Sequence, residues 1–302
     1  MDINDTIVQI CTTEYEKFID DKNIIGIAKG KKITAGVKTN DSCITIFVEE
    51  KLPYDTIATN KLIPSYYKGI KTDVVETGKI SSLSLTNKIR PALGGYSIGV
   101  IGITAGTIAC AVRSINTDPP QYYLLSNNHT FANENLSQIG SPILQPGPYD
   151  GGSTEKDIIG YLYDYEPISF ITANRSPKNY VDCALAICDI EDISNNIALI
   201  GKITGISRAR VGMNVKKTGR TTAYTTGKIL YTNASIIVSY EDGDALFVNQ
   251  IITTSMSQGG DSGSLLLNNS NKAIGLLFAG SQTFSICNPI STVLKTLNIE
   301  LL

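Results

Sequence analysis

The hydrophobic pattern changes character about a third of the way along the chain. Over residues 5–22 the apolar side chains recur at helical spacing, which predicts one amphipathic helix. Short Ile- and Val-rich runs follow, broken by Lys and Pro positions, and we expect these to be strands. The predicted strands are Ile24–Ala28, Ile33–Val37, Ile44–Val48 and Thr72–Val75, with a hairpin at Lys29–Lys32. Residues 1–90 are therefore predicted to form a small N-terminal α+β unit.

From about residue 92, short Val-, Ile-, Thr- and Tyr-rich runs alternate with clusters of Gly, Asn, Asp and Pro. This spacing is typical of an all-β sandwich or barrel. The clearest runs are Tyr122–Leu125, Val181–Cys188, Gly227–Tyr231, Ile236–Tyr240, Leu246–Thr254, Ser264–Leu267 and Ala273–Phe278. After Pro289 the apolar positions return to helical spacing, which predicts a short closing helix over residues 290–302. The boundary between the two parts is expected near Lys88–Gly95.

Composition narrows the function classes. The chain has 302 residues, enough for two domains, and 42% of them are apolar. Lys and Arg total 26 against 28 Asp and Glu, a balance without the basic footprint of a nucleic-acid-binding protein. No apolar run reaches the ~18 residues of a membrane span, and the acidic start does not resemble a secretory signal. We therefore expect a cytoplasmic protein with neither a nucleic acid nor a membrane as partner.

The cysteine and histidine counts exclude further chemistry. Six scattered cysteines form no CxxC pair, so we expect reduced core thiols; the alternative, disulfides, would need an oxidising compartment. The only histidine is His129, which rules out sites built on two imidazoles.

The segment Gln258–Ser264, with the sequence QGGDSGS, lies between two predicted strands. Glycines on both sides of Ser262 permit unusual backbone angles and a close approach of substrate to the main chain. Nearby amides could then face a developing oxyanion. The same sequence is also a reasonable turn without catalytic function.

Two further segments carry candidate chemistry. His129 follows a predicted strand in the polar sequence SNNHTF, and Asp182 stands at the head of the apolar run VDCALAIC. Alone, His129 fits a hydrogen-bonded loop residue, and Asp182 fits an acid that faces water or caps an amide. Together with Ser262 they indicate nucleophilic catalysis, because a serine nucleophile needs a base and the base needs an orienting acid.

The order His129, Asp182, Ser262 in a β-rich chain resembles the chymotrypsin-like (trypsin-fold) serine peptidases of bacterial type. GDSG around Ser262 matches their nucleophile motif, VDCALA their aspartate strand, and GRTTAYTTG from Gly219 their GRTTG-type strand and turn. SNNHTF stands in the place of their histidine motif, with Asn127 and Asn128 where many members carry small residues. More narrowly, SNNHTFAN, QPGPYDGG and the N-terminal ITIFVEEKLP resemble a little-described bacterial trypsin-like group related to the plant narrow-leaf proteins.

This resemblance implies a mainly β fold of two antiparallel six-stranded β-barrels with the cleft between them. The peptidase domain would span 91–302, with barrel one at about 91–192, barrel two at about 193–289 and the helix at 290–302. It implies a triad of His129, Asp182 and Ser262, an oxyanion hole formed by the amides of Gly260 and Ser262, and no metal or cofactor. The edge strand Phe278-Ala279-Gly280 would pair with the substrate, although Phe278 also fits a core position.

The family register also implies a pocket residue six positions before the nucleophile, which is Met256. An uncharged residue there predicts uncharged, apolar P1 side chains of moderate size, because a Lys or Arg side chain would lack a counter-charge. The alternative is that Met256 belongs to the core.

Other acidic residues could in principle orient His129 in place of Asp182. Asp150 fits a turn, and Asp157 and Asp164 fit solvated positions. In animal members of the family, the aspartate that matches Asp261 binds a new N-terminus formed by activation cleavage. No start of that kind is visible here, so Asp261 is expected to be held by local amides or an internal Arg. The predicted function is serine endopeptidase activity on peptides or proteins. The alternative is a catalytically silent peptidase fold that binds peptides or acts as a scaffold, and the N-terminal unit leaves a homo-oligomer open.

Overall fold

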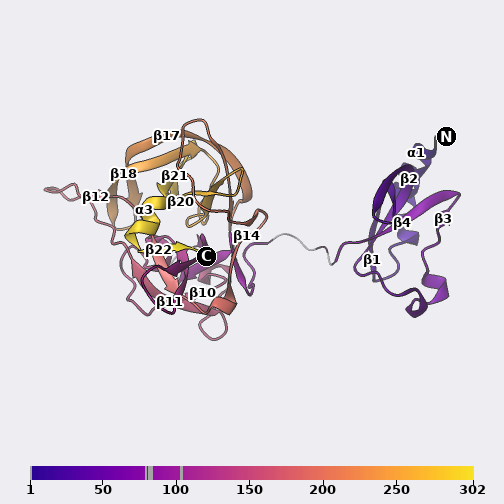
Figure 1. Cartoon of the computed structure of the whole chain (residues 1–302), viewed down its shortest axis with the longest axis horizontal. Coiled ribbons are helices and arrows are strands. Elements are labelled where there is room, and N and C mark those ends of the chain that lie inside the picture. Colours follow the sequence, from indigo (N-terminus) through magenta and orange to yellow (C-terminus); the bar gives the residue numbers. More distant parts are fainter. Residues whose placement is uncertain (1, 79, 81–83, 103–104) are drawn as a thin grey trace. The chain divides into compact units, whose positions relative to one another are not determined.

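The computed structural model describes residues 2–78, 80, 84–102 and 105–302, and the chain divides into two compact units (Figure 1). These units are Met1–Leu83 and Ser84–Leu302. The second unit begins before the predicted boundary because residues 84–90 pack on it. The Leu85 carbonyl accepts from the Ser97 amide at 2.8 Å, and the Ile89 amide donates to the Gln145 side chain at 3.0 Å.

The N-terminal unit is a four-stranded sheet, in the order β1-β2-β4-β3, with one helix. Its helical elements are α1 (Ile3–Thr13) and the 3-10 turns η1 (Tyr15–Lys17), η2 (Tyr54–Thr56) and η3 (Thr59–Lys61). Its strands are β1 (Ile24–Thr34), β2 (Val37–Val48), β3 (Tyr66–Tyr67) and β4 (Ile70–Glu76). Ile7 and Ile10 of α1 are buried in one cluster with Ile44 and Ile46 of the sheet.

Two local predictions for this unit were wrong. The predicted helix over 5–22 ends at Thr13, and the chain continues as the 3-10 turn η1. The Glu14 side chain between them accepts from Tyr67 (2.8 Å) and Lys68 (2.6 Å). The β1–β2 hairpin turns at Ala35-Gly36, whose φ angles of 49° and 79° suit a two-residue turn. Lys29–Lys32 therefore lie within β1.

The first sheet of the C-terminal unit has eight strands, in the order β22-β8-β9-β13-β11-β10-β6-β7. These are β6 (Ser97–Val100), β7 (Gly106–Thr107), β8 (Cys110–Ser114), β9 (Tyr122–Ser126), β10 (Pro142–Leu144), β11 (Ile158–Tyr165), β13 (Ala184–Ile187) and β22 (Ile299–Leu301). The helical turns α2 (Asn128–Phe131) and η4 (Pro148–Asp150) interrupt it. We call this sheet barrel one.

The second sheet closes on itself, because β18 pairs with both β17 and β21. The six-stranded circuit runs β18-β17-β16-β19-β20-β21 and back to β18. The short strand β12 is not part of this circuit and pairs with β18 in parallel. The strands are β12 (Lys178–Asn179), β16 (Asn214–Gly219), β17 (Ala223–Tyr240), β18 (Gly243–Thr254), β19 (Leu265–Asn268), β20 (Ala273–Gly280) and β21 (Phe284–Pro289). We call this sheet barrel two; β17 is one long strand where two short ones were predicted.

A shared apolar core joins the two barrels. Leu125 and Leu185 of barrel one are buried in one cluster with Leu265 and Leu276 of barrel two and Val293 of the closing helix. That helix, α3 (Ile290–Thr296), is shorter than predicted, and the chain then returns as β22 to pair with β8. The remaining elements are the small sheet of β5 (Ala92–Gly94), β14 (Ile193–Ile197) and β15 (Gly201–Lys202), and the turn η5 (Ile190–Asp192).

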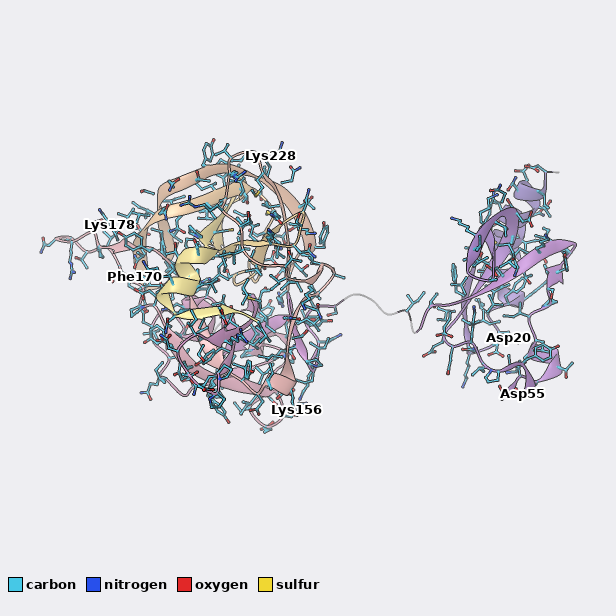
Figure 2. The ribbon with its side chains drawn as sticks, in the orientation of Figure 1. Asp20, Asp55, Lys156, Phe170, Lys178 and Lys228 are labelled. Carbon is cyan, nitrogen blue, oxygen red and sulfur yellow. The ribbon has the colours of Figure 1, made fainter. Side chains whose placement is uncertain are left out.

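The prediction of a mainly β, two-barrel chymotrypsin-like fold with a short C-terminal helix is confirmed. Barrel two has the six strands predicted, whereas barrel one has eight, because the short strand β7 and the returning strand β22 add to its two ends. One segment projects from this unit beside β12 (Figure 1), between Phe170 and Lys178, which are labelled near its base in Figure 2. It is narrow because Thr172 and Arg175 form an isolated β-bridge across it.

All six cysteines are free thiols in the structure. Five are buried and Cys11 is partly buried. Burial raises the pKa of Cys110, Cys188 and Cys287 to about 12, which keeps these thiols protonated at neutral pH. Within the described residues, no helix has the length and apolar character that a membrane crossing requires.

Candidate active site

His129 and Asp182 are brought into direct contact, although 53 positions separate them in the sequence. His129 lies on α2, directly after β9, and Asp182 precedes β13, which pairs with β9. The His129 Nδ1 atom is 2.6 Å from Asp182 Oδ2. The Asp182 side chain is fully buried, whereas the His129 side chain is 19% exposed. One imidazole nitrogen is therefore oriented by the acid while the ring edge stays accessible.

The buried carboxylate of Asp182 has several hydrogen-bond donors. Its Oδ1 accepts from the amides of Asn128 (2.7 Å) and His129 (3.4 Å), and its Oδ2 also accepts from the Tyr240 hydroxyl (2.9 Å). Asn127 Nδ2 donates to the Asp182 carbonyl at 2.7 Å. These donors offset the cost of burying a charge.

The two carboxylates near the imidazole control its protonation. Burial of the ring lowers the pKa of His129, but the charge and hydrogen bond of Asp182 and the charge of Glu134 raise it by more. The net result is a pKa above the ordinary histidine value. A proton taken by His129 is thus held more firmly than in a free imidazole.

Ser262 lies in a tight turn that residue Thr107 of barrel one clamps. The Thr107 amide donates to the Ser262 carbonyl at 2.8 Å, and the Thr107 hydroxyl donates to the Gly260 carbonyl at 2.8 Å. Gly260 has a φ of 91°, and a Cβ on Gly263 would lie 2.1 Å from the Thr107 carbonyl oxygen, so both positions require glycine.

Hydrogen-bonding groups at this turn remain available. In the parts of the chain that the structure describes, no group accepts from the amides of Gly260 and Ser262, and the Ser262 hydroxyl makes no hydrogen bond. The two amides and the hydroxyl are thus free for a ligand. A hydrogen bond between a serine and its base is often long until substrate is bound.

Asp261, next to Ser262, is held by a buried ion pair. Lys217 Nζ lies 3.0 Å from Asp261 Oδ2, and the two side chains are 1% and 0% exposed. The same carboxylate accepts from the amides of Thr221 (2.9 Å), Thr222 (3.1 Å) and Gln258 (2.9 Å). Burial alone would raise the pKa of Asp261, but the Lys217 charge and these hydrogen bonds lower it below its ordinary value. The turn is therefore anchored from within the unit.

Local amides hold Asp261, as predicted, but the cation beside it is a lysine and not the internal Arg given as the alternative. Arg220, the arginine of the GRTT sequence, instead forms a bidentate pair with Asp150, with Nε to Oδ2 at 2.8 Å. Asp150 is thus a turn residue, as predicted, and also the partner of Arg220. Asp157 was predicted to be solvated but is buried beside Lys88 at 3.2 Å, whereas Asp164 is exposed as predicted.

Two cavities flank the end of β20. The first, about 510 Å³, is lined by Ser262 and by uncharged residues, namely Ser255, Ser257, Gln258, Gly259, Leu277, Ala279, Gly280, Ser281 and Gln282. The second, about 690 Å³, is lined by His129, Glu134, Tyr240 and Phe278, and it shares Ala279, Gly280 and Ser281 with the first. Ser262 and His129 therefore face adjoining hollows on either side of one strand end.

The end of β20 also has a free edge. On one side β20 pairs with β21 as far as Gly280, but on the other its last partner is Leu265 of β19, opposite Leu276. Within the described residues no strand pairs with Ala279 and Gly280 on that second side, so this edge can accept another strand.

Two predicted substrate residues are core residues. Met256 is 5% exposed and packs with Val215, Ile229 and Leu277 inside barrel two, so the neighbouring cavity is lined by Ser255 and Ser257 instead. Side chains alternate along an extended segment, which explains the exchange. Phe278 is 3% exposed, and its ring lies 4.7 Å from that of Phe247, although it also borders the second cavity.

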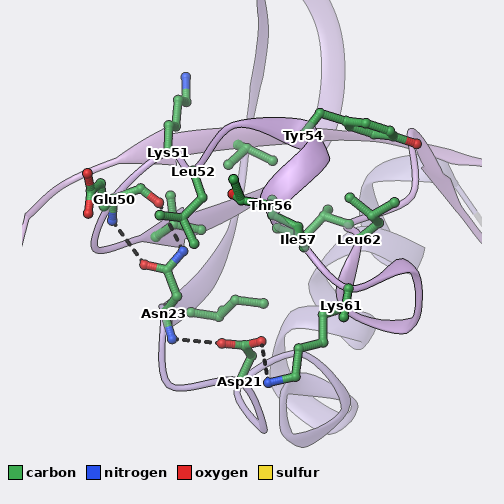
Figure 3. A pocket seen from close by; sticks show the side chains of 15 residues that line it. Asp21, Asn23, Glu50, Lys51, Leu52, Tyr54, Thr56, Ile57, Lys61 and Leu62 are labelled. Carbon is green, nitrogen blue, oxygen red and sulfur yellow. Dashed lines mark hydrogen bonds and ion pairs between the residues drawn. The ribbon is translucent and has the colours of Figure 1, made fainter.

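A further cavity, of about 590 Å³, lies within the N-terminal unit (Figure 3). Its walls are tied together by an ion pair between Asp21 and Lys61 (3.2 Å) and by the Asn23 side chain, which bonds the backbone of Glu50. None of the three motif residues lines it. All three of these residues lie in the C-terminal unit.

Lys217, Tyr240 and Thr107 were not assigned from the sequence. Lys217 lies on the same strand face as Val215 and Gly219, and all three are buried. Because side chains two positions apart share a face, this pattern is a signal for an inward lysine. Tyr240 likewise shares a strand face with Ile236 and Val238. Thr107 has no such signal, because its contacts depend on how the two barrels meet.

A model of peptidase family S64 matches residues 173–298, and comparison with curated proteins gives no match. The structure is similar to protease A from Thermobifida fusca, with 20% identity, a TM-score of 0.51, and coverage of 70% of this chain and 97% of that one. It is also similar to the Nocardiopsis protease NAPase, with 19% identity, a TM-score of 0.50, and coverage of 69% and 97%. The C-terminal unit therefore has the chymotrypsin-like fold of these proteases.

We predict that Lys217→Met lowers the free energy of unfolding by about 3–5 kcal/mol, because it leaves the Asp261 carboxylate buried without its cation. Urea unfolding followed by fluorescence measures the change. Lys216→Met is the matched control, since Lys216 makes no ion pair among the described residues. Adding Asp261→Asn to Lys217→Met should restore part of the loss, and an unfolding free energy of Lys217→Met equal to the parent's would contradict this role.

Proposed function

We propose that this chain is a serine endopeptidase that hydrolyses peptide bonds through an acyl-enzyme. The observation that carries the proposal is the 2.6 Å contact of His129 with buried Asp182, beside a clamped turn that presents Ser262 with two free amides. The chymotrypsin-like fold and the match to a peptidase family model support it.

Each group has a role that its chemistry supports. Ser262 attacks the scissile carbonyl, and His129 takes the hydroxyl proton through the nitrogen that does not face Asp182. Asp182 fixes the tautomer and stabilises the imidazolium without taking the proton. The amides of Gly260 and Ser262 donate to the oxyanion, and each such donor is worth roughly 2.7–4 kcal/mol of barrier in other enzymes. His129 then gives the proton to the leaving amine.

The free edge of β20 supports binding of an extended peptide. Ala279 and Gly280 have no strand partner on their second side among the described residues, and they line both the cavity of Ser262 and the cavity of His129. A substrate strand added at this edge passes both, which favours a peptide or protein substrate over a small ester. The rival function is a silent peptidase fold that binds peptides without cleaving them.

The relationship to the plant narrow-leaf proteins, the cytoplasmic location and an oligomer formed through the N-terminal unit stay predictions. So does the expectation that neither nucleic acid, membrane, metal nor cofactor takes part.

Ser262→Ala tests the nucleophile. We expect turnover of an activated ester or of a denatured protein to fall by at least about a thousandfold, since the acyl-enzyme has no other attachment point. The melting temperature should stay within about 1 °C, because the hydroxyl makes no hydrogen bond within the described residues. Ser270→Ala, in an exposed turn, is the matched control. Residual activity equal to the parent's would remove Ser262 from the mechanism.

The pH dependence tests the base. Only neutral imidazole accepts the serine proton, so kcat/KM should fall on acidification through the pKa of His129. Because Asp182 and Glu134 raise that pKa, the acidic limb should lie above the ~6.5 of a free histidine. His129→Ala should abolish the limb together with the activity. A limb that persists in an active His129→Ala protein would identify another base.

The cavity beside Ser262 supports a preference for uncharged P1 side chains. Its hydroxyl- and amide-bearing walls include no Lys, Arg, Asp or Glu, so a charged P1 side chain would be desolvated without a partner. These walls also favour polar uncharged side chains such as glutamine alongside the apolar ones first predicted.

Ser257→Asp should therefore introduce cleavage after Lys and Arg, whereas the matched Ser257→Asn should not. A P1-scanning peptide library measures the preference of all three proteins. Preferred cleavage after Lys or Arg by the parent would be incompatible with this pocket.

A further inference from the structure

Tyr240 and His129 donate to the same oxygen of Asp182. The Tyr240 hydroxyl lies 2.9 Å from Asp182 Oδ2, and His129 Nδ1 lies 2.6 Å from it. Tyr240 is the last residue of β17 in barrel two, whereas His129 and Asp182 belong to barrel one. The hydroxyl therefore reaches the carboxylate from the opposite side of the cleft.

Several contacts fix the position of Tyr240. Its ring centroid lies 6.0 Å from that of His129, in an edge-on arrangement, and 6.1 Å from those of Phe170 and Phe247. Directly after Tyr240 the hairpin turns, and the amides of Glu241 and Asp242 donate to the Glu134 carboxylate at 3.3 and 3.1 Å. Glu134 follows α2 in barrel one, so the hairpin end is tied to the segment that carries the histidine.

We propose that Tyr240 is a positioning residue for the His129–Asp182 pair, holding the Asp182 carboxylate in one orientation and limiting how strongly it draws a proton onto the imidazole. The inference rests on the proposed function for its catalytic consequence. Its physical basis is that a carboxylate oxygen shared by two donors has less negative charge to offer either of them. Without the hydroxyl, Oδ2 serves His129 alone, and the imidazolium becomes more stable.

The lone histidine makes a direct test simple, because every imidazole signal in an NMR spectrum belongs to His129. We expect Tyr240→Phe to raise the titration midpoint of His129 by about half to one pH unit. The substitution keeps the ring and removes only the hydroxyl. Apart from Tyr240 itself, the charged or titratable groups that face the imidazole among the described residues are Asp182, Glu134 and Glu241, and the substitution changes none of them.

Tyr224→Phe is the matched control, since Tyr224 stands on the same strand, is 45% exposed and makes no hydrogen bond through its hydroxyl among the described residues. Its midpoint should equal the parent's. An unchanged midpoint in a folded Tyr240→Phe protein, verified by its melting temperature, overturns the proposal.

Kinetics provide the second measurement. In Tyr240→Phe we expect kcat to fall about tenfold while KM stays within about twofold, because the ring that borders the cleft is retained. A higher KM with unchanged kcat would mean that Tyr240 only lines the cleft, and would overturn the proposal.

The NMR titration needs no turnover. An inactive parent would therefore contradict the proposed function and leave the NMR result to decide on Tyr240 by itself.

Discussion

The structure of the C-terminal unit depends on how one buried carboxylate, that of Asp182, is compensated. An isolated charge in a protein interior is prohibitively costly, so its donors must be in place whenever the chain is folded. They come from the start of α2, from His129 and from the end of β17. The Asp182 amide in turn donates to Asn288 of β21, and Asn288 bonds Gln250 of β18. The contacts that join the two barrels here are therefore also contacts of the site.

A second buried carboxylate, that of Asp261, is compensated in the same way on the other side of the cleft. Asp261 stands next to Ser262 as Asp182 stands next to His129 in space, and each has no exposed surface. Lys217 and the amides of residues 221, 222 and 258 hold Asp261, and through it they hold the turn that presents Ser262. Because the lysine comes from β16 of the same unit, the turn needs no newly cut chain end to order it. The turn that carries Ser262 is thus supported by a strand residue, and support from strands is more rigid than support from loops.

Much of this arrangement could be predicted from the sequence. The β-rich pattern after residue 92, the three short motifs and their order predict the fold and bring attention to His129, Asp182 and Ser262. What failed depends on long-range packing. Strand alternation turns Met256 into the core and its serine neighbours into the cavity. The β1–β2 hairpin is a local exception, since it is set by the positive φ angles of Ala35 and Gly36. For Asp261, local amides or an internal Arg were predicted: the amides are present, but the cation is Lys217, whose inward position depends on how β16 packs.

A fluorophosphonate probe shows whether Ser262 is an activated nucleophile, because the probe forms a covalent bond only with a serine that a base and an oxyanion hole activate. Intact-mass measurement followed by peptide mapping reads out the product. We expect one adduct per chain, located on Ser262, and none in Ser262→Ala. A folded parent that acquires no adduct, or one that carries it on another residue, would contradict the proposed activity and favour the silent peptide-binding fold.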